Sequence, residues 1–152
     1  MYQASLKISS EHLYDEETRD KITSIVDAKI AMRDGNLYIS YVEEAITQDG
    51  EEVPIEDNVD IQTTIKISSG SVKITKSGEN VPVRRLEFSL DKPYESLMYT
   101  PMGNFTMMVF TKHLENTLDA FGNGSLHLEY DTRLNGLHTN SSKLKISYLE
   151  ER

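Results

Sequence analysis

The 152-residue chain contains no cysteine and no tryptophan, and it has only four prolines and eight glycines. The absence of cysteine excludes a disulfide scaffold, a thiol nucleophile and a zinc site built on thiolates. Basic residues are also in deficit, because 16 lysines and arginines face 25 aspartates and glutamates and give a formal net charge of −9. A phosphate-backbone partner needs clustered lysine and arginine, so we expect no nucleic-acid partner.

Long hydrophobic runs are absent as well. The first residues, MYQASLKISSEH, have no basic start followed by an apolar core, so they do not resemble a secretory signal. No apolar stretch approaches the roughly 20 residues that span a bilayer. We therefore expect one domain over residues 1–152 that lies in the cytoplasm and has no membrane partner.

Apolar residues recur at every second position along most of the chain. This alternation predicts strands with one face on a core and one face in water. It is clearest in six runs, Leu37-Ile39-Tyr41, Thr63-Ile65-Ile67, Leu86-Phe88-Leu90, Phe105-Met107-Val109, Leu126-Leu128-Tyr130 and Leu144-Ile146-Tyr148.

Turn residues separate these runs. They fall at 34–36, 69–70, 77–80, 100–103, 122–124 and 135–136. Short strands joined by tight turns predict an antiparallel meander. A sheet of about eight to ten strands is large enough to curl and close, which removes its edges. The sequence therefore predicts an all-β, up-and-down antiparallel barrel.

Two segments depart from the alternation. Residues 9–21 are polar and charged, and we interpret them as a long loop with helical character. Residues 112–122 place Leu114 and Leu118 at helical spacing, so a helical turn and a strand are both open there. We favour the strand, because residues 105–111 already alternate.

Residues 43–60 form an acid-rich segment with eight acidic residues and no lysine or arginine. A divalent cation is one use for so many carboxylates, because hard cations take several carboxylate oxygens. The spacing does not match an EF-hand loop, so we favour a solvated hairpin loop that keeps the protein soluble. We expect no metal centre and no cofactor.

Sequence signatures of catalysis are missing. The motifs GxSxG and HExxH do not occur, nor do the P-loop and the dinucleotide fingerprint. No two histidines have the spacing of a local metal pair. By alternation His127 should face solvent, whereas His113 can point inward near a strand end. We interpret the protein as a non-enzyme and assign no catalytic residue.

Two cations share a face with the core. Lys76 continues the apolar alternation before the turn SGEN, and Arg84 continues it after the turn. A hairpin symmetric about Asn80 pairs these two residues at one mouth of the barrel, whereas a bulge at Pro82 would bring Arg85 inward instead. A buried cation is costly unless it meets an anion. The pair therefore predicts a carboxylate or phosphate ligand, or else two side chains that extend to water or bond nearby carboxylates.

Several segments together resemble the YwiB-like bacterial proteins. They are NLYISYVEE (36–44), TTIKISSGSVKITKSG (63–78), LEF (86–88), YTPMGNFTMMV (99–109), LHLEY (126–130) and the closing LKISYLEE. The resemblance implies a lipocalin-like (calycin) barrel of unknown function and supplies no catalytic residue. The family favours arginine where this chain has Lys76 and an aromatic residue where it has Met98. Lys76 keeps the charge but loses the planar fork, which weakens a bidentate grip on an anion.

Two functions from different classes follow. The first is a barrel that holds a small apolar or amphipathic anionic ligand, with contacts from Lys76, Arg84, Arg85, Tyr99, His113, Tyr130 and Tyr148. The alternative is a filled barrel that acts as a protein-interaction or homo-oligomer module without a ligand. Met108 and Phe110 make the strand near residue 108 apolar on both faces, which predicts a homodimer.

Overall fold

The computed structural model describes the backbone of residues 2–13, 19–43, 45–48, 51–54, 61–78, 84–119, 121, 123–134 and 137–148. Side chains are described for the same residues except 43, 45–48, 51–54, 100, 137–140 and 148. Within these ranges no helix is long and apolar enough to cross a bilayer.

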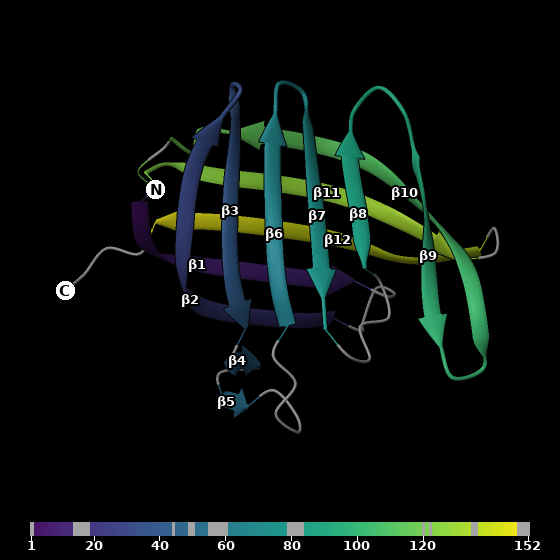
Figure 1. Cartoon of the computed structure of the whole chain (residues 1–152). Coiled ribbons are helices and arrows are strands. Elements are labelled where there is room, and N and C mark those ends of the chain that lie inside the picture. The colour runs from purple at the N-terminus through teal and green to yellow at the C-terminus, as the bar shows by residue number, and fades with distance from the viewer. Residues whose placement is uncertain are drawn as a thin grey trace.

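The described residues form twelve strands (Figure 1). In chain order they are β1 (Tyr2–Leu13), β2 (Arg19–Arg33), β3 (Asn36–Glu43), β4 (Ala45–Gln48), β5 (Glu51–Pro54), β6 (Ile61–Ser68), β7 (Ser71–Ser77), β8 (Arg85–Ser89), β9 (Tyr94–Thr100), β10 (Gly103–Asn116), β11 (Ser125–Leu134) and β12 (Leu137–Tyr148).

Ten of these strands follow one another around a nearly closed antiparallel barrel, in the order β8-β7-β6-β3-β2-β1-β12-β11-β10-β9. The first and last strands of the chain pair directly, from Leu6↔Tyr148 to Leu13↔Ser141. At the seam, the Ser96 hydroxyl donates to the Arg85 carbonyl at 2.6 Å. The predicted all-β antiparallel architecture of about eight to ten barrel strands is confirmed, and the barrel is nearly closed.

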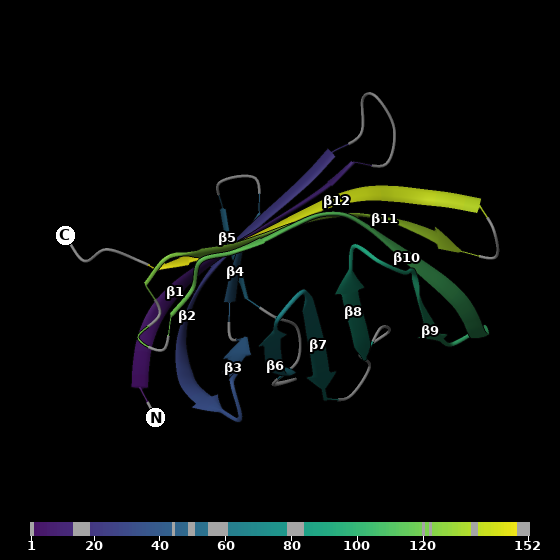
Figure 2. The same ribbon diagram turned by 90° about the horizontal axis from the view of Figure 1, so that it is seen from above.

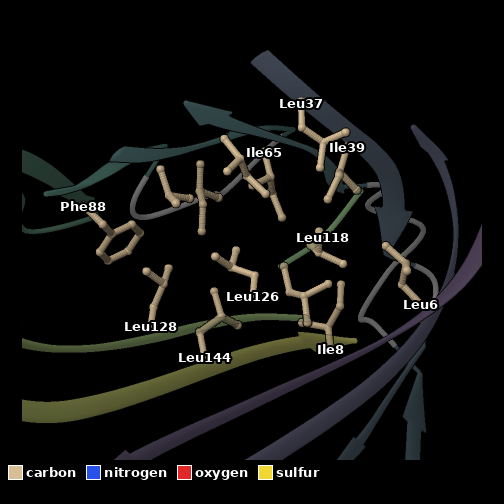
Figure 3. Packing of buried hydrophobic residues seen from close by; sticks show 14 of the residues in the cluster. Leu6, Ile8, Leu37, Ile39, Ile65, Phe88, Leu118, Leu126, Leu128 and Leu144 are labelled. Atoms are coloured by element: carbon tan, nitrogen blue, oxygen red, sulfur yellow. The ribbon is translucent and has the colours of Figure 1, made fainter. Parts of the chain in front are cut away.

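The barrel is flattened into two layers. Strands β3, β6, β7 and β8 run across β1, β12 and β11, with the core between them (Figures 1 and 2). Alternate residues of both layers point inward and are buried, among them Ile65, Phe88 and Leu126 (Figure 3). Each fully buried side chain of this size contributes about 1.5–3 kcal/mol, so the period-two alternation is the main source of stability.

The expected long loop over residues 9–21 is wrong. Strand β1 runs to Leu13 and β2 begins at Arg19, so most of this segment is a two-stranded extension. An ion pair of 3.2 Å between Arg19 and Glu11 links the two strands on their exposed side. Polar residues are compatible with strands here because this end of the hairpin lies at the barrel mouth rather than over the core.

The strand favoured for residues 112–122 is confirmed as far as Asn116, and the helical alternative is wrong. Strand β10 continues to Asn116, with a bulge between Thr111 and His113. The chain then turns, and the Asp119 carboxylate accepts backbone hydrogen bonds from Phe121 at 2.8 Å and Asn123 at 3.0 Å. The bulge reverses which residues of β10 face inward, and this reversal decides where His113 lies.

The acid-rich segment contains the hairpin β4–β5, as expected. Strand β4 pairs with β2 through Ile22↔Gln48 and Thr23↔Thr47. The acidic side chains of this segment lie outside the described residues.

Candidate functional site

A row of polar residues ends the apolar inner face of β1, β12 and β11. His12 pairs with Ser142, and Ser142 pairs with Tyr130 on the next strand. Four residues further along each strand, Ile8, Ile146 and Leu126 occupy the same inner face and are buried. The row is therefore the polar end of an otherwise apolar layer.

The opposite layer ends in the same way. Thr63 of β6 pairs with Lys76 of β7, directly beyond the buried pair Ile65↔Ile74. The backbone N–H of Lys76 donates to the Arg84 carbonyl at 2.8 Å. This contact confirms the predicted hairpin register, in which residues 76 and 84 lie opposite each other.

The two polar ends face each other across the barrel. The positive charge of Lys76 acts on His12, which lies on the other layer. The Phe88 and Tyr130 rings also meet across the interior, with centroids 4.7 Å apart. We call His12, Thr63, Lys76, Tyr130 and Ser142 the mouth belt. It combines one cation, one imidazole and three hydroxyls at the edge of the apolar core.

Hydrogen bonds connect one side of the mouth belt. The His12 Nδ1 and the Ser142 Oγ are 2.7 Å apart. Ser142 also hydrogen-bonds to the Tyr130 hydroxyl, and burial raises the pKa of Tyr130 so that the phenol stays protonated. Burial lowers the pKa of His12, the Asp20 carboxylate partly offsets that shift, and Lys76 adds to it. At neutral pH the His12 imidazole of the belt is therefore neutral.

Thr63 is the most unusual member of the belt. Its side chain is 0% exposed, and its hydroxyl has no hydrogen-bond partner among the described residues. Leaving a buried hydroxyl unpaired costs about 1–3 kcal/mol, and valine has nearly the same shape without that cost. The Thr63 hydroxyl, which pairs in register with Lys76, can donate a hydrogen bond to an acceptor at this position.

Of the seven residues predicted to contact a ligand, Lys76 and Tyr130 lie in the mouth belt. Arg84 is exposed, and its guanidinium carbon lies 4.9 Å from the centre of the Tyr99 ring. Arg85 pairs with the exposed Thr75 and hydrogen-bonds to the Tyr94 side chain at the seam. The arginines therefore interact with strand β9.

Tyr99 and His113 do not point into the barrel. Tyr99 is exposed and follows Met98, which packs against the core. The inward orientation expected for His113 is wrong, because the bulge in β10 turns it outward. There it lies 3.3 Å from Glu115, and its ring centroid is 5.1 Å from that of His127. His127 is on the outer face, as predicted.

The remaining candidate, Tyr148, pairs with Leu6 through the backbone. Its side chain lies outside the described residues. Within the described part of the chain, no group of three or more histidine, aspartate or glutamate side chains is arranged to hold a metal ion.

Sequence reasoning missed His12, Ser142 and Thr63 as site residues. The signal for His12 was present, because Leu6, Ile8 and position 12 share one parity and β1 carries the alternation through to Leu13. The polar character of residues 9–21 concealed it.

Fold and belt together define a class of protein, a small antiparallel β-barrel with polar groups at one mouth of an apolar interior. The chain belongs to the family described as a domain of unknown function, DUF1934, which matches residues 6–146.

Among solved structures, the chain is similar to the ywiB protein from Bacillus subtilis, with a TM-score of 0.72 and 18% sequence identity. The match covers 98% of this chain and 93% of that one, and it shows the fold alone. A search of curated proteins gave no match.

Proposed function

We propose that this protein is a lipocalin-like (calycin) barrel that binds a small amphipathic anion, with the head group at the mouth belt and the apolar part against the core. The observation that carries the proposal is the buried Thr63 hydroxyl, which has no partner in the described structure and lies opposite Lys76. A carboxylate or phosphate oxygen would accept from this hydroxyl and from the Lys76 ammonium.

The rest of the belt suits the same head group. The Tyr130 and Ser142 hydroxyls and a neutral His12 offer directional contacts on the facing layer. Ile65 and Ile74 adjoin Thr63 and Lys76, so an apolar tail leaving the head group meets the core directly. The proposal assigns the protein a cytoplasmic setting and no catalytic step.

The test is calorimetric titration with decanoate and with decanol, which share a tail and differ in the charge of the head group. We expect decanoate to bind and Lys76→Gln to weaken it by about tenfold or more, with decanol changed by less than about twofold. Lys73→Gln is the matched control, because Lys73 lies on the same strand but faces outward opposite Lys66. Absence of saturable decanoate binding to the wild-type protein would refute the proposal.

A homo-oligomer module is the second candidate, favoured by apolar residues on the outer face of β9 and β10. Leu97 and Tyr99 are exposed there, and Met102 in the adjoining turn is 88% exposed. The pairings Leu97↔Thr106 and Glu95↔Met108 place this group beside Met108. Strand β9 also ends the strand order, so a second copy could extend or cover this edge.

Light scattering at tens of micromolar tests this second candidate. We expect a dimer that Leu97→Glu converts to a monomer. Leu90→Glu is the matched control, because Leu90 is also exposed but lies outside this outer face. A monomeric wild-type protein would contradict the homodimer.

A further inference from the structure

A second polar site lies on the outside of the barrel, away from the mouth belt. The outer face of β2, β1, β12 and β11 contains a depression of about 330 Å³. The lining residues Lys7, Lys145 and His127 directly precede the buried residues Ile8, Ile146 and Leu128 in the strand alternation, so they lie on the face turned away from the core. Its walls carry four lysines, namely Lys7, Lys21, Lys143 and Lys145, together with His127, Glu11 and three serines. We call this depression the lysine groove.

Strand register explains why the lysines gather. Lys145 pairs with Ser9, and Lys7 pairs with Ser147, so these two lysines are diagonal neighbours. Glu11 lies between Lys143 on one side and Lys21 on the other. Diagonal neighbours, like residues two apart on one strand, have Cβ atoms about 7 Å apart. Lys7, Lys145 and Lys143 thus follow one another at this spacing, and Lys21 lies across Glu11 from Lys143.

Most of this positive charge has no ion-pair partner among the residues that the structure describes. Lys143 pairs with Glu129 at 3.7 Å. Glu11 is 3.2 Å from Arg19, outside the groove lining. Within the described part of the chain, Lys7, Lys21 and Lys145 form no ion pair. Four of the 16 basic residues of an acidic protein are thus concentrated at one depression, where like charges repel.

We propose that the lysine groove binds a small polyanion with at least two anionic groups about 7 Å apart. Lysine ammonium groups bind such oxygens as point charges, and the Ser9 and Ser147 hydroxyls add donors. The groove lining includes no apolar residue, so the ligand differs from the amphipathic anion assigned to the mouth belt.

The size of the groove favours a small molecule over a macromolecule. Its volume of about 330 Å³ is in the range of small-molecule sites. A long acidic polymer would extend beyond the four lysines and meet a protein whose net charge is −9. A phosphate compound and a polycarboxylate can both supply the required anionic groups, and the titration below distinguishes between these two classes of ligand.

Calorimetric titration of the full chain with tripolyphosphate, citrate and orthophosphate, at about 50 mM salt, tests the proposal. We expect tripolyphosphate or citrate to bind at one site, and whichever binds more tightly identifies the class of anion. The double substitution Lys7→Gln with Lys145→Gln should weaken the binding of that anion by about tenfold or more. Lys66→Gln with Lys73→Gln is the matched control, because these outward lysines pair with each other on β6 and β7 and change the net charge equally.

Three results would overturn the proposal. The first is an equal loss of affinity in the two double variants. The second is orthophosphate binding as tightly as tripolyphosphate or citrate. The third is an acidic peptide such as octaglutamate binding more tightly than tripolyphosphate and citrate. Thermal unfolding of both variants verifies that each is folded. Decanoate binding should be unchanged in the Lys7 and Lys145 variant, so the outcome is independent of the mouth belt.

Discussion

Replacing Thr63 by valine should stabilise the protein and weaken its ligand binding at the same time. The Thr63 hydroxyl is fully buried and has no partner among the described residues, so the folded state carries its desolvation cost. That cost is about 1–3 kcal/mol, and valine fills nearly the same volume with a methyl group. We expect Thr63→Val to raise the free energy of unfolding by about 1–2 kcal/mol.

Urea denaturation measures this gain. With a dependence on urea of about 2 kcal/mol per molar, the midpoint should rise by roughly 0.5–1 M at an unchanged slope. Thr75→Val is the matched control, because Thr75 is exposed on β7 and its substitution should change stability by less than about 0.5 kcal/mol. Decanoate affinity should fall in Thr63→Val and stay constant in Thr75→Val.

Two outcomes would refute this reasoning. If Thr63→Val lowered the stability by more than about 1 kcal/mol, the hydroxyl would have a favourable partner in the free protein. If the stability rose but decanoate affinity did not change, the hydroxyl would not contact the head group.

The remaining predictions concern pH and backbone strain. Burial lowers the pKa of His12, so the unfolded chain takes up a proton first as the pH falls below about 6.5, and stability should decrease there. His12→Asn should reduce this loss of stability between pH 6.5 and 5, whereas the control His127→Asn should not. Equal urea midpoints across that range in the wild-type protein and in His12→Asn would contradict this prediction. Gly124 has a φ of +98°, and an added Cβ would lie 2.2 Å from the Thr117 carbonyl oxygen. Gly124→Ala should therefore cost more than about 2 kcal/mol in thermal unfolding. Gly70→Ala, at a φ of +78° with nothing within 4 Å of the added Cβ, should cost less, and equal losses would disprove the close-contact argument.

Alternation in the sequence predicted the architecture well where each strand is half-buried. The register of β7 and β8 followed from the turn centred on residue 80, and it placed Lys76 opposite Arg84 correctly. Tyr130 followed from the same argument, because it continues the parity of Leu126 and Leu128. Local patterns of this kind suffice because each strand of a meander pairs with its neighbour in sequence.

The errors arose where the local pattern changes or where pairing is distant. One extra residue in β10 turns His113 outward, and a bulge of this kind leaves no clear mark in a polar sequence. His12 joins Ser142 only because β1 pairs with β12, across 130 residues of chain. Arg84 was predicted to point toward the barrel interior, but it is exposed and its guanidinium lies over Tyr99, on a strand that the alternation alone does not place beside it.

A crystal structure of the protein grown with decanoate tests the central proposal most directly. We predict the carboxylate within hydrogen-bond distance of the Lys76 Nζ and the Thr63 Oγ1, with the tail between Ile74 and the facing layer. A decanoate bound elsewhere on the protein, with Thr63 still unpaired beside Lys76, would contradict it.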